Sequence, residues 1–295
     1  MWSSAFCVAA TCFVAATICA DAFVHSTKFS TLPKNVRASC LTMEAAAFNL
    51  MSLNKVKKVL LNVEDVEKSL SFFTEALGMK DNGDGSVGFA DEISLQFQKA
   101  ADIIQGEDFD CVGINVPNLN AAVEKVSSCG GSLVNGPTEV TFGASFFPDE
   151  DVDVEIKKTV ARVTDPNGVP IELIEEEKPS IAKARFFVSN IEKNQDFYEA
   201  LGMKLLRKRS LLPEIAAIRG FVGYGSEDEF LIELHYNYGV DKIEPGTRLD
   251  SVGIYTLDVA KGVDSLKSAG VEPDSVSDKQ VMLVSPDSHK LSMVE

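Results

Sequence analysis

Residues 63–73 read VEDVEKSLSFF, and residues 188–198 read VSNIEKNQDFY. Both segments lead into the same five letters, ALGMK, at 76–80 and at 200–204. A second matching pair follows downstream, DCVGI at 110–114 and DSVGI at 250–254. Similarity at corresponding places in the two halves predicts that the chain arose by internal duplication.

Each half of the chain shows a β-α-β-β-β pattern twice. Residues 56–63 predict a strand from their β-branched and leucine content. Asp65 can cap the next helix, in which apolar side chains recur every three to four residues. Further strands are expected at 94–98, 112–116 and 170–174, a helix near 120–128, and a linker at 177–180. The sequence therefore predicts an α+β fold of four βαβββ units.

The two halves differ in the length of one connection. The extra stretch in the first half contains FFPDEDVDVE at 146–155, which is acidic and begins with two aromatic residues. The preferred interpretation is a solvated surface loop, and the alternative is a lid over a cleft.

The charge balance excludes some classes of function. The chain has 28 basic and 44 acidic residues, a formal net charge of −16, and no run rich in Lys and Arg. Binding to nucleic acid through its phosphates needs clustered cations, so no nucleic-acid partner is expected. No glycine-rich phosphate-binding motif occurs either, so the sequence does not support a nucleotide site.

The N-terminal part is typical of a targeting sequence. Residues 5–20 form an uncharged, mostly apolar run that ends in Ala20-Asp21-Ala22, which predicts a signal peptide over 1–22. The following residues to Met43 are basic, rich in hydroxyl groups and free of acids, which predicts a transit peptide and leader over 23–53. A plain secretory signal or an N-terminal anchor is the alternative.

This tandem arrangement resembles the bipartite presequence of algae with secondary plastids, so the expected location is the plastid (chloroplast) stroma. Only Cys111 and Cys129 remain after residue 43, which fits a reducing compartment better than a disulfide-bonded secreted protein. No membrane association is expected for the mature form.

The body of the chain, from about residue 54 to 295, resembles glyoxalase I (lactoylglutathione lyase) of the vicinal oxygen chelate superfamily, in its fused two-domain plant-like form. The resemblance rests on LGMKLLRKR at 201–209, GYGSED at 223–228 and IELHYNYGVDK at 232–242, together with DPNGVPIEL at 165–173. It implies two tandem glyoxalase-like domains, 54–176 and 181–295, whose mixed sheets curl around a cleft. Because the duplication already supplies the interface between units, a monomer is expected.

The resemblance also implies an activity and a metal site. Glyoxalase I isomerises the hemithioacetal of methylglyoxal and glutathione, using Ni²⁺ or Zn²⁺ to stabilise the enediolate and a carboxylate to move the proton. Four protein ligands are expected from units of opposite halves. The family pattern places them here at Lys183, Glu233, Cys111 and Glu172 in one site, and at Lys58, Gln96, Ser251 and Ser292 in the other.

Both sites depart from the family pattern, because a lysine stands where a first ligand is expected. The site with Lys58 has neither carboxylate nor imidazole and is interpreted as degenerate. In the other site, Glu172 and Glu233 remain, and buried carboxylates need a compensating cation. We hypothesise that Lys183 replaces the metal as their counter-ion, since a protonated lysine cannot ligate a metal. No cofactor is then expected. The alternative is that Glu172, Glu233 and Cys111 still bind Ni²⁺ or Zn²⁺, with Glu172 as the catalytic base.

Glutathione recognition is retained only in part. Asn237 and Lys158 match residues that the resemblance assigns to binding of glutathione, although an ordinary turn residue and a solvated lysine are equally good interpretations. Arginines expected to pair with the glutathione carboxylates are replaced, by Asn62 and Phe187 at one position and by Glu107 at another.

Three other residues carry weaker expectations. Cys111 is interpreted as a small apolar strand residue, with a thiol of lowered pKa as the alternative. His235 shares a strand face with Glu233; a half-exposed position is preferred, and a place in the lining of the cleft is the alternative. His289 is expected in an exposed turn.

Three functions remain open. The first is a plastid glyoxalase I-like protein with weak or lost activity. The second is an active lactoylglutathione lyase, or a related metal-dependent lyase or isomerase, that uses Glu172 and Glu233. The third is a small-molecule binding protein of the same fold, whose ligand is a glutathione adduct or another compound.

Overall fold

The structure is a computed structural model, and it describes residues 54–90, 93–142, 156–212 and 215–295. The predicted signal peptide and transit peptide, and the acidic loop at 146–155, lie outside these residues.

Four helices of ten residues each carry the repeat: α3 (Val66–Glu75), α4 (Leu119–Ser128), α5 (Ile191–Ala200) and α6 (Val259–Ser268). Each begins in the same way, with an extended Asp or Asn whose side chain accepts a hydrogen bond from the backbone N–H three residues later. Such a cap satisfies a donor that the first turn leaves free. The predicted cap at Asp65 is confirmed.

Each helix stands second in a βαβββ unit, so the predicted fold class is confirmed. The first unit adds β1 (Lys55–Val63), β2 (Lys80–Asp81), β3 (Ser86–Gly88) and β4 (Ser94–Lys99), and the second adds β5 (Phe109–Val116), β6 (Ser132–Phe142), β7 (Ile156–Thr164) and β8 (Pro170–Glu175). The third adds β9 (Ser180–Phe187), β10 (Lys204–Ser210), β11 (Ala217–Gly223) and β12 (Leu231–Asn237), and the fourth adds β13 (Leu249–Tyr255), β14 (Ser275–Val276), β15 (Gln280–Val284) and β16 (Lys290–Val294).

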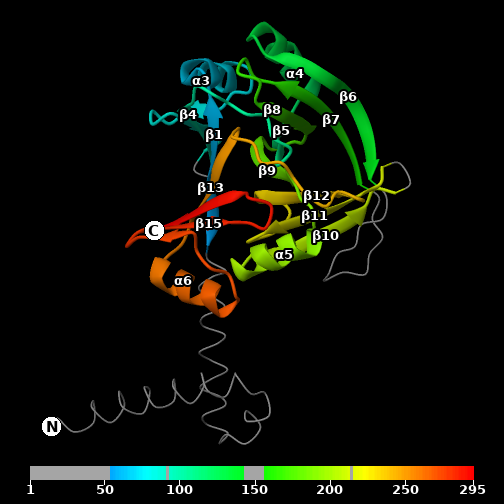
Figure 1. Cartoon of the computed structure of the whole chain (residues 1–295). Coiled ribbons are helices and arrows are strands. Elements are labelled where there is room, and N and C mark those ends of the chain that lie inside the picture. The colour runs from blue at the N-terminus through cyan, green and yellow to red at the C-terminus, as the bar shows by residue number, and fades with distance from the viewer. Residues whose placement is uncertain (1–53, 91–92, 143–155, 213–214) are drawn as a thin grey trace, which may run out of the picture. The chain divides into compact units, whose positions relative to one another are not determined.

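Strand pairing joins the two halves of the chain. The first and fourth units form one mixed sheet of eight strands, joined by the antiparallel pair β1–β13. The second and third units form the other, joined by the antiparallel pair β5–β9. We call these the outer-unit sheet and the inner-unit sheet. Figure 1 shows α3 and α4 toward one end of the view and α5 and α6 toward the other.

The turns before the last strand of a unit dock on helices of other units. Asp165, in the turn before β8, accepts a hydrogen bond from Ser69 on α3 at 2.5 Å. Asp287, in the turn before β16, accepts hydrogen bonds from Ser189 and from Asn194 on α5, at 2.5 and 2.6 Å. These contacts connect one eight-stranded sheet to helices of the other.

The expectation that His289 is exposed is wrong. Only 1% of this residue is exposed, and its ring stacks on Phe186 with centroids 4.6 Å apart. One ring nitrogen lies 2.9 Å from the Ser285 hydroxyl and the other 3.2 Å from the Asp108 carbonyl. His289 is buried because this side of the turn packs against the neighbouring sheet, a contact that local sequence does not reveal.

Candidate functional site

The inner-unit sheet places the predicted residues of one site on a single face. Lys183 on β9 lies opposite Gly113 on β5, and Glu172 on β8 lies on the other side of Gly113. Glu233 on β12 lies opposite Arg185, two residues after Lys183. Because side chains alternate along a strand, all of these project from the same face.

Lys183 bridges the two retained carboxylates. Its Nζ lies 2.6 Å from Glu172 Oε2 and 2.7 Å from Glu233 Oε2. The Lys183 side chain is 13% exposed, that of Glu172 is 11% exposed, and that of Glu233 is fully buried. The structure therefore brings together the three residues of the counter-ion hypothesis.

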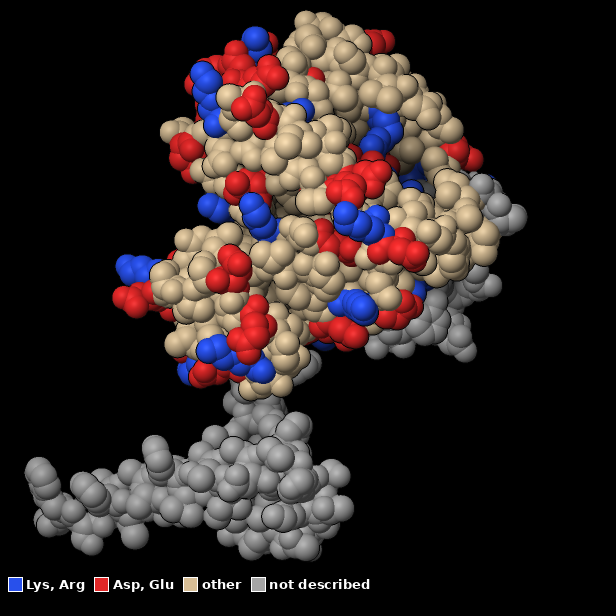
Figure 2. Space-filling view, in the orientation of Figure 1, with Lys and Arg blue, Asp and Glu red and all other residues tan. Residues whose placement is uncertain are grey.

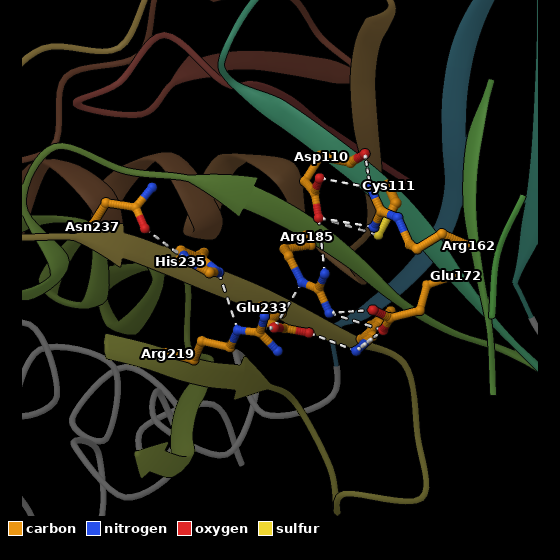
Figure 3. A network of polar contacts seen from close by, with 10 residues as sticks. Asp110, Cys111, Arg162, Glu172, Arg185, Arg219, Glu233, His235 and Asn237 are labelled. Atoms are coloured by element: carbon orange, nitrogen blue, oxygen red, sulfur yellow. Dashed lines mark hydrogen bonds and ion pairs between the residues drawn. The ribbon is translucent and has the colours of Figure 1, made fainter. Parts of the chain in front are cut away.

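A second cation, which the sequence analysis did not identify, holds the same two carboxylates. One terminal nitrogen of Arg185 donates to both oxygens of Glu172 at 2.8 Å, and Nε donates to Glu233 Oε1 at 2.8 Å. The other terminal nitrogen donates to Asp110 Oδ2, also at 2.8 Å (Figure 3). The sequence contained one signal for Arg185. It stands two residues after Lys183, which puts both cations on the same face of β9.

The network extends beyond this centre on both sides. Arg162 binds both carboxylate oxygens of Asp110, at 2.8 and 3.0 Å. Arg219 Nε lies 3.1 Å from Glu233 Oε1 and 3.0 Å from a ring nitrogen of His235. The other ring nitrogen of His235 lies 3.0 Å from the side-chain oxygen of Asn237, so the chain of contacts continues to the end of β12 (Figure 3).

Burial and charge set the pKa values of the two glutamates. Burial alone would raise the pKa of Glu172, but Lys183 and Arg185 outweigh it and lower this pKa to about 2. The same balance, with Arg185 as the largest favourable contribution, holds the pKa of Glu233 well below its usual range. Both carboxylates are therefore ionised at neutral pH and are weak proton acceptors.

His235 is buried rather than half-exposed, with 6% of the residue accessible. Burial, together with the charge of Arg219, lowers its pKa to about 4. The imidazole is therefore neutral at pH 7 and hydrogen-bonds within the network.

The preferred interpretation of Cys111, a small apolar residue of a strand, is confirmed. It is completely buried and lies opposite Arg185 on β5, not opposite Lys183. Burial raises the pKa of its thiol to about 12. The alternative of a reactive thiol with a lowered pKa is therefore wrong, because the desolvation of a thiolate outweighs the nearby arginine.

A pocket of about 800 Å³ opens beside the lysine and Glu172. It is lined by polar and apolar residues of the inner-unit sheet and its loops: Asn115, Lys158, Val160, Glu172, Ile174, Glu176, Glu177, Lys178, Ser180, Ala182, Lys183, Arg207, Arg209, Phe221, Glu227, Asp228, Glu229 and Leu231. The Arg207 guanidinium lies 4.2 Å from the centre of the Phe221 ring and 3.1 Å from Glu227 Oε1. Figure 2 shows acidic and basic side chains interspersed over one face of the molecule.

The two predicted glutathione-binding residues have different surroundings. Lys158 is on the pocket wall, where its ammonium pairs with Glu176. Asn237 is at the end of β12 beside His235, and it is not among the residues that line this pocket. The structure does not bring Lys158 and Asn237 together on one wall.

The corresponding positions in the outer-unit sheet carry no such network. Lys58 Nζ donates a hydrogen bond to Gln96 Oε1 at 3.2 Å. Ser251 lies opposite Leu60 on the neighbouring strand, and Ser292 lies on the far side of Gly253 from Lys58. All four predicted positions therefore share a face, without a carboxylate among them.

The donor set of the inner-unit sheet does not fit a divalent metal as it is arranged. Every oxygen of Glu172 and Glu233 already lies within 2.8 Å of Lys183 or Arg185. A metal ion would have to displace both cations. Over the described part of the chain, no group of three or more His, Cys, Asp and Glu side chains is arranged to hold a metal.

Within the described residues, none of the helices has the length and apolar character needed to cross a membrane.

Comparison with known proteins agrees with this architecture. The family model for the Glyoxalase/Bleomycin resistance protein/Dioxygenase superfamily matches residues 55–173 and 180–282. A probable chloroplastic lactoylglutathione lyase of Arabidopsis thaliana is 30% identical over 264 residues, which cover 80% of this chain and 71% of that protein. A lactoylglutathione lyase of Oryza sativa subsp. japonica is 29% identical over 238 residues, covering 72% of this chain and 77% of the relative.

A solved structure shares the fold. The crystal structure of glyoxalase I from Zea mays superposes with a TM-score of 0.69 at 24% identity, covering 82% of this chain and 92% of that one. The four βαβββ units and these matches show that the chain belongs to the glyoxalase superfamily, in the fused two-domain form of glyoxalase I.

Proposed function

We propose that this chain is a glyoxalase I-like protein with weak or lost lactoylglutathione lyase activity, in which Lys183 replaces the catalytic metal as counter-ion to Glu172 and Glu233. The observation that carries the proposal is the position of the Lys183 ammonium, 2.6 Å from one carboxylate and 2.7 Å from the other. An ammonium stabilises the two buried charges, but it leaves no coordination position for substrate oxygens.

The low pKa of Glu172 supports the same conclusion. Proton abstraction next to a carbonyl is fastest when the base has a pKa near the working pH. A carboxylate whose pKa is lowered to about 2 by two cations is a poor base at pH 7. On this proposal, the site supplies neither a Lewis acid nor an effective base, which supports weak or lost activity.

Metal analysis and a direct assay test this proposal. The purified protein is loaded with excess Ni²⁺ or Zn²⁺, passed through a desalting column and analysed for bound metal. Isomerisation of the methylglyoxal–glutathione hemithioacetal is then measured with and without added metal. We expect substoichiometric metal and a rate close to that of a Glu172→Gln control. Stoichiometric metal, with turnover that disappears in Glu172→Gln, would instead establish an active lyase that uses Glu172 and Glu233.

We propose that the pocket beside Lys183 binds a small molecule. Its volume of about 800 Å³ lies in the range of small-ligand sites, and its wall combines apolar side chains such as Val160 and Leu231 with charged ones. A ligand that prefers the native state raises the melting temperature, so a thermal-shift screen that includes S-lactoylglutathione and glutathione tests this directly. Loss of the shift in Lys158→Ala would assign that lysine to binding.

We propose a plastid location for the protein. A relative that matches 80% of this chain is named chloroplastic, and the leader has the composition of a signal peptide followed by a transit peptide. A fusion of residues 1–53 to a fluorescent protein tests the proposal. Import into plastids is expected, with secretion of the fusion as the contradicting result.

We also propose that the mature chain is a monomer of two domains, 54–176 and 181–295. Each half supplies two units, and each unit finds its sheet partner in the other half of the same chain. Light scattering on residues 54–295 is expected to give the mass of one chain, and a dimer mass would refute this assignment.

A further inference from the structure

We propose that Arg185, and not Lys183 alone, closes this site to divalent metals, so that changing Lys183 to a metal ligand leaves the site metal-free until Arg185 is also replaced. This inference rests on the function proposed above. It assigns a metal-excluding role to a residue that is not a predicted ligand position.

The guanidinium of Arg185 lies where the carboxylates converge. It binds Glu172, Glu233 and Asp110, each at 2.8 Å, and only 5% of the side chain is exposed. Glu172 receives bonds to both of its oxygens from one terminal nitrogen. A guanidinium in a protein does not deprotonate near neutral pH, so Arg185 is a permanent cation at this point.

Removal of Lys183 would leave this arrangement in place. The lysine contacts one oxygen of Glu172 and one of Glu233. Arg185 independently contacts both oxygens of Glu172 and the other oxygen of Glu233. A metal ion placed between the two carboxylates would therefore meet a like charge within a few ångströms in a buried site, which is strongly unfavourable.

The outer-unit sheet provides an internal comparison. Strand register shows that Leu60 occupies the position of Arg185: Leu60 lies opposite Gln96 and Ser251, and Arg185 lies opposite Glu233 and Cys111. The first-ligand lysine is present in both sheets, whereas the arginine is present only in the sheet that keeps the acids. Of these two cations, only Arg185 is specific to the sheet that keeps the carboxylates.

Other contacts in the network show that replacement of Arg185 leaves neither Asp110 nor Glu233 without a cation. Asp110 keeps its two bonds to Arg162, at 2.8 and 3.0 Å. Glu233 keeps the contact with Arg219 at 3.1 Å. When position 185 is leucine or glutamine and Lys183 is also replaced, Glu172 has lost both of its cations and Glu233 keeps only Arg219. The pair then carries an uncompensated negative charge that a metal ion can neutralise.

Metal binding by a set of full-length variants tests the inference. The proteins are the wild type, Lys183→His, and Lys183→His combined with Arg185→Leu. Each is titrated with Ni²⁺ by calorimetry and with Co²⁺ by visible absorption, which reports inner-sphere coordination. We expect the wild type and Lys183→His to bind no specific metal. The double variant should bind one ion at least about 100-fold more tightly than any residual binding by Lys183→His, a difference of about 2.7 kcal/mol, because the like charge of Arg185 is gone.

Two controls keep the result interpretable. Lys183→His combined with Arg185→Gln repeats the charge change with a side chain that can still donate to a carboxylate, in case the leucine variant does not fold by circular dichroism. Lys58→His makes the same ligand change in the sheet that lacks acids, and it should bind no metal.

The outcomes separate this inference from the proposed function. Equal metal affinity of Lys183→His and the double variant would overturn the role of Arg185, as would folded double variants that bind no metal. A wild-type protein that binds stoichiometric Ni²⁺ would instead overturn the proposed function itself.

Discussion

At the scale of single residues, the site is a buried salt-bridge network. Glu172 and Glu233 are held by two cations, and the arginine also reaches Asp110. Desolvating two carboxylates is expensive, and the attraction of well-placed cations offsets that cost only while each charge keeps its partners. Removal of one member of such a network lowers the free energy of unfolding. The network as a whole need not make the protein more stable than an apolar core of the same volume would.

The first prediction concerns the free energy of unfolding. In the wild-type background, Arg185→Leu should lower it by about 1.5–3 kcal/mol, because three buried carboxylates lose charge-assisted hydrogen bonds although each keeps another cation. Urea denaturation at pH 7 measures this. Lys58→Met is the matched control, since Lys58 is only half-buried and its ammonium has a neutral partner, Gln96. We expect the control to change stability by less than about 1 kcal/mol. Equal losses in both variants would show that the arginine does not stabilise the acids.

At the scale of elements, one glycine in each sheet makes room for the lysine on the adjacent strand. A Cβ on Gly113 would lie 2.5 Å from Lys183 Cγ and 2.8 Å from its Cε. A Cβ on Gly253 would lie 2.5 Å from Lys58 Cγ and 3.0 Å from its Cε. The aliphatic part of the lysine side chain therefore crosses the neighbouring strand in both sheets. The two sites differ in the contacts of the ammonium, which has two ion pairs at Lys183 and one hydrogen bond at Lys58.

This difference predicts unequal effects of the same substitution. Gly113→Ala should cost about 1–3 kcal/mol of unfolding free energy, because the lysine cannot move without breaking two ion pairs. Gly253→Ala should cost less, because Lys58 gives up only the hydrogen bond to Gln96. Paired denaturation curves test the order, and a larger loss for Gly253→Ala would contradict it.

At the scale of the whole molecule, units that are distant in sequence form each sheet, and the turns of one sheet dock on helices of the other. Asp287 and His289 lie in such a turn, against α5 and against Phe186 on β9. Burial lowers the pKa of His289, as it does that of His235. Native packing therefore keeps both imidazoles neutral.

The consequence is a pH dependence of stability in two stages. The pKa of His235 falls from its ordinary 6.5 to about 4 in the folded protein, so the unfolded chain takes up the proton first as pH falls. Stability should be greatest above pH 6.5 and decline between about 6.5 and 4, by on the order of 2 kcal/mol for His235. A second decline in stability should follow below about pH 4.5. There Glu172 and Glu233 take up protons in the unfolded chain, whereas their lowered pKa values keep them ionised in the folded protein.

Urea denaturation from pH 3 to 8 measures both stages. His235→Gln should reduce the decline between pH 6.5 and 4 and leave the one below pH 4.5. A variant that keeps the full first decline would exclude His235 as its source, and a wild-type profile that is flat down to pH 4 would contradict the neutral state of both histidines.

The site was predictable from the sequence as far as its positions, but not in its full chemistry. The resemblance to glyoxalase I singled out Lys183, Glu172 and Glu233 as ligand positions, and strand register then brought them into contact. Arg185 was missed because it matches no ligand position. Its place two residues after Lys183 was the available signal. The alternation of side chains along a strand predicts which face of the sheet Arg185 occupies, but not which carboxylates its side chain contacts.

The sequence by itself determined the four βαβββ units, because capping residues and apolar periodicity are local and recur in each unit. Only the tertiary structure decided that Arg185 joins three carboxylates and that His289 is buried. Those facts depend on which strands and turns become neighbours across more than seventy residues of chain, as with Arg185 and Asp110 or His289 and Asp108. The physical reason is that charge pairing and burial are properties of the assembled sheets, whereas helix and strand propensity belong to each segment.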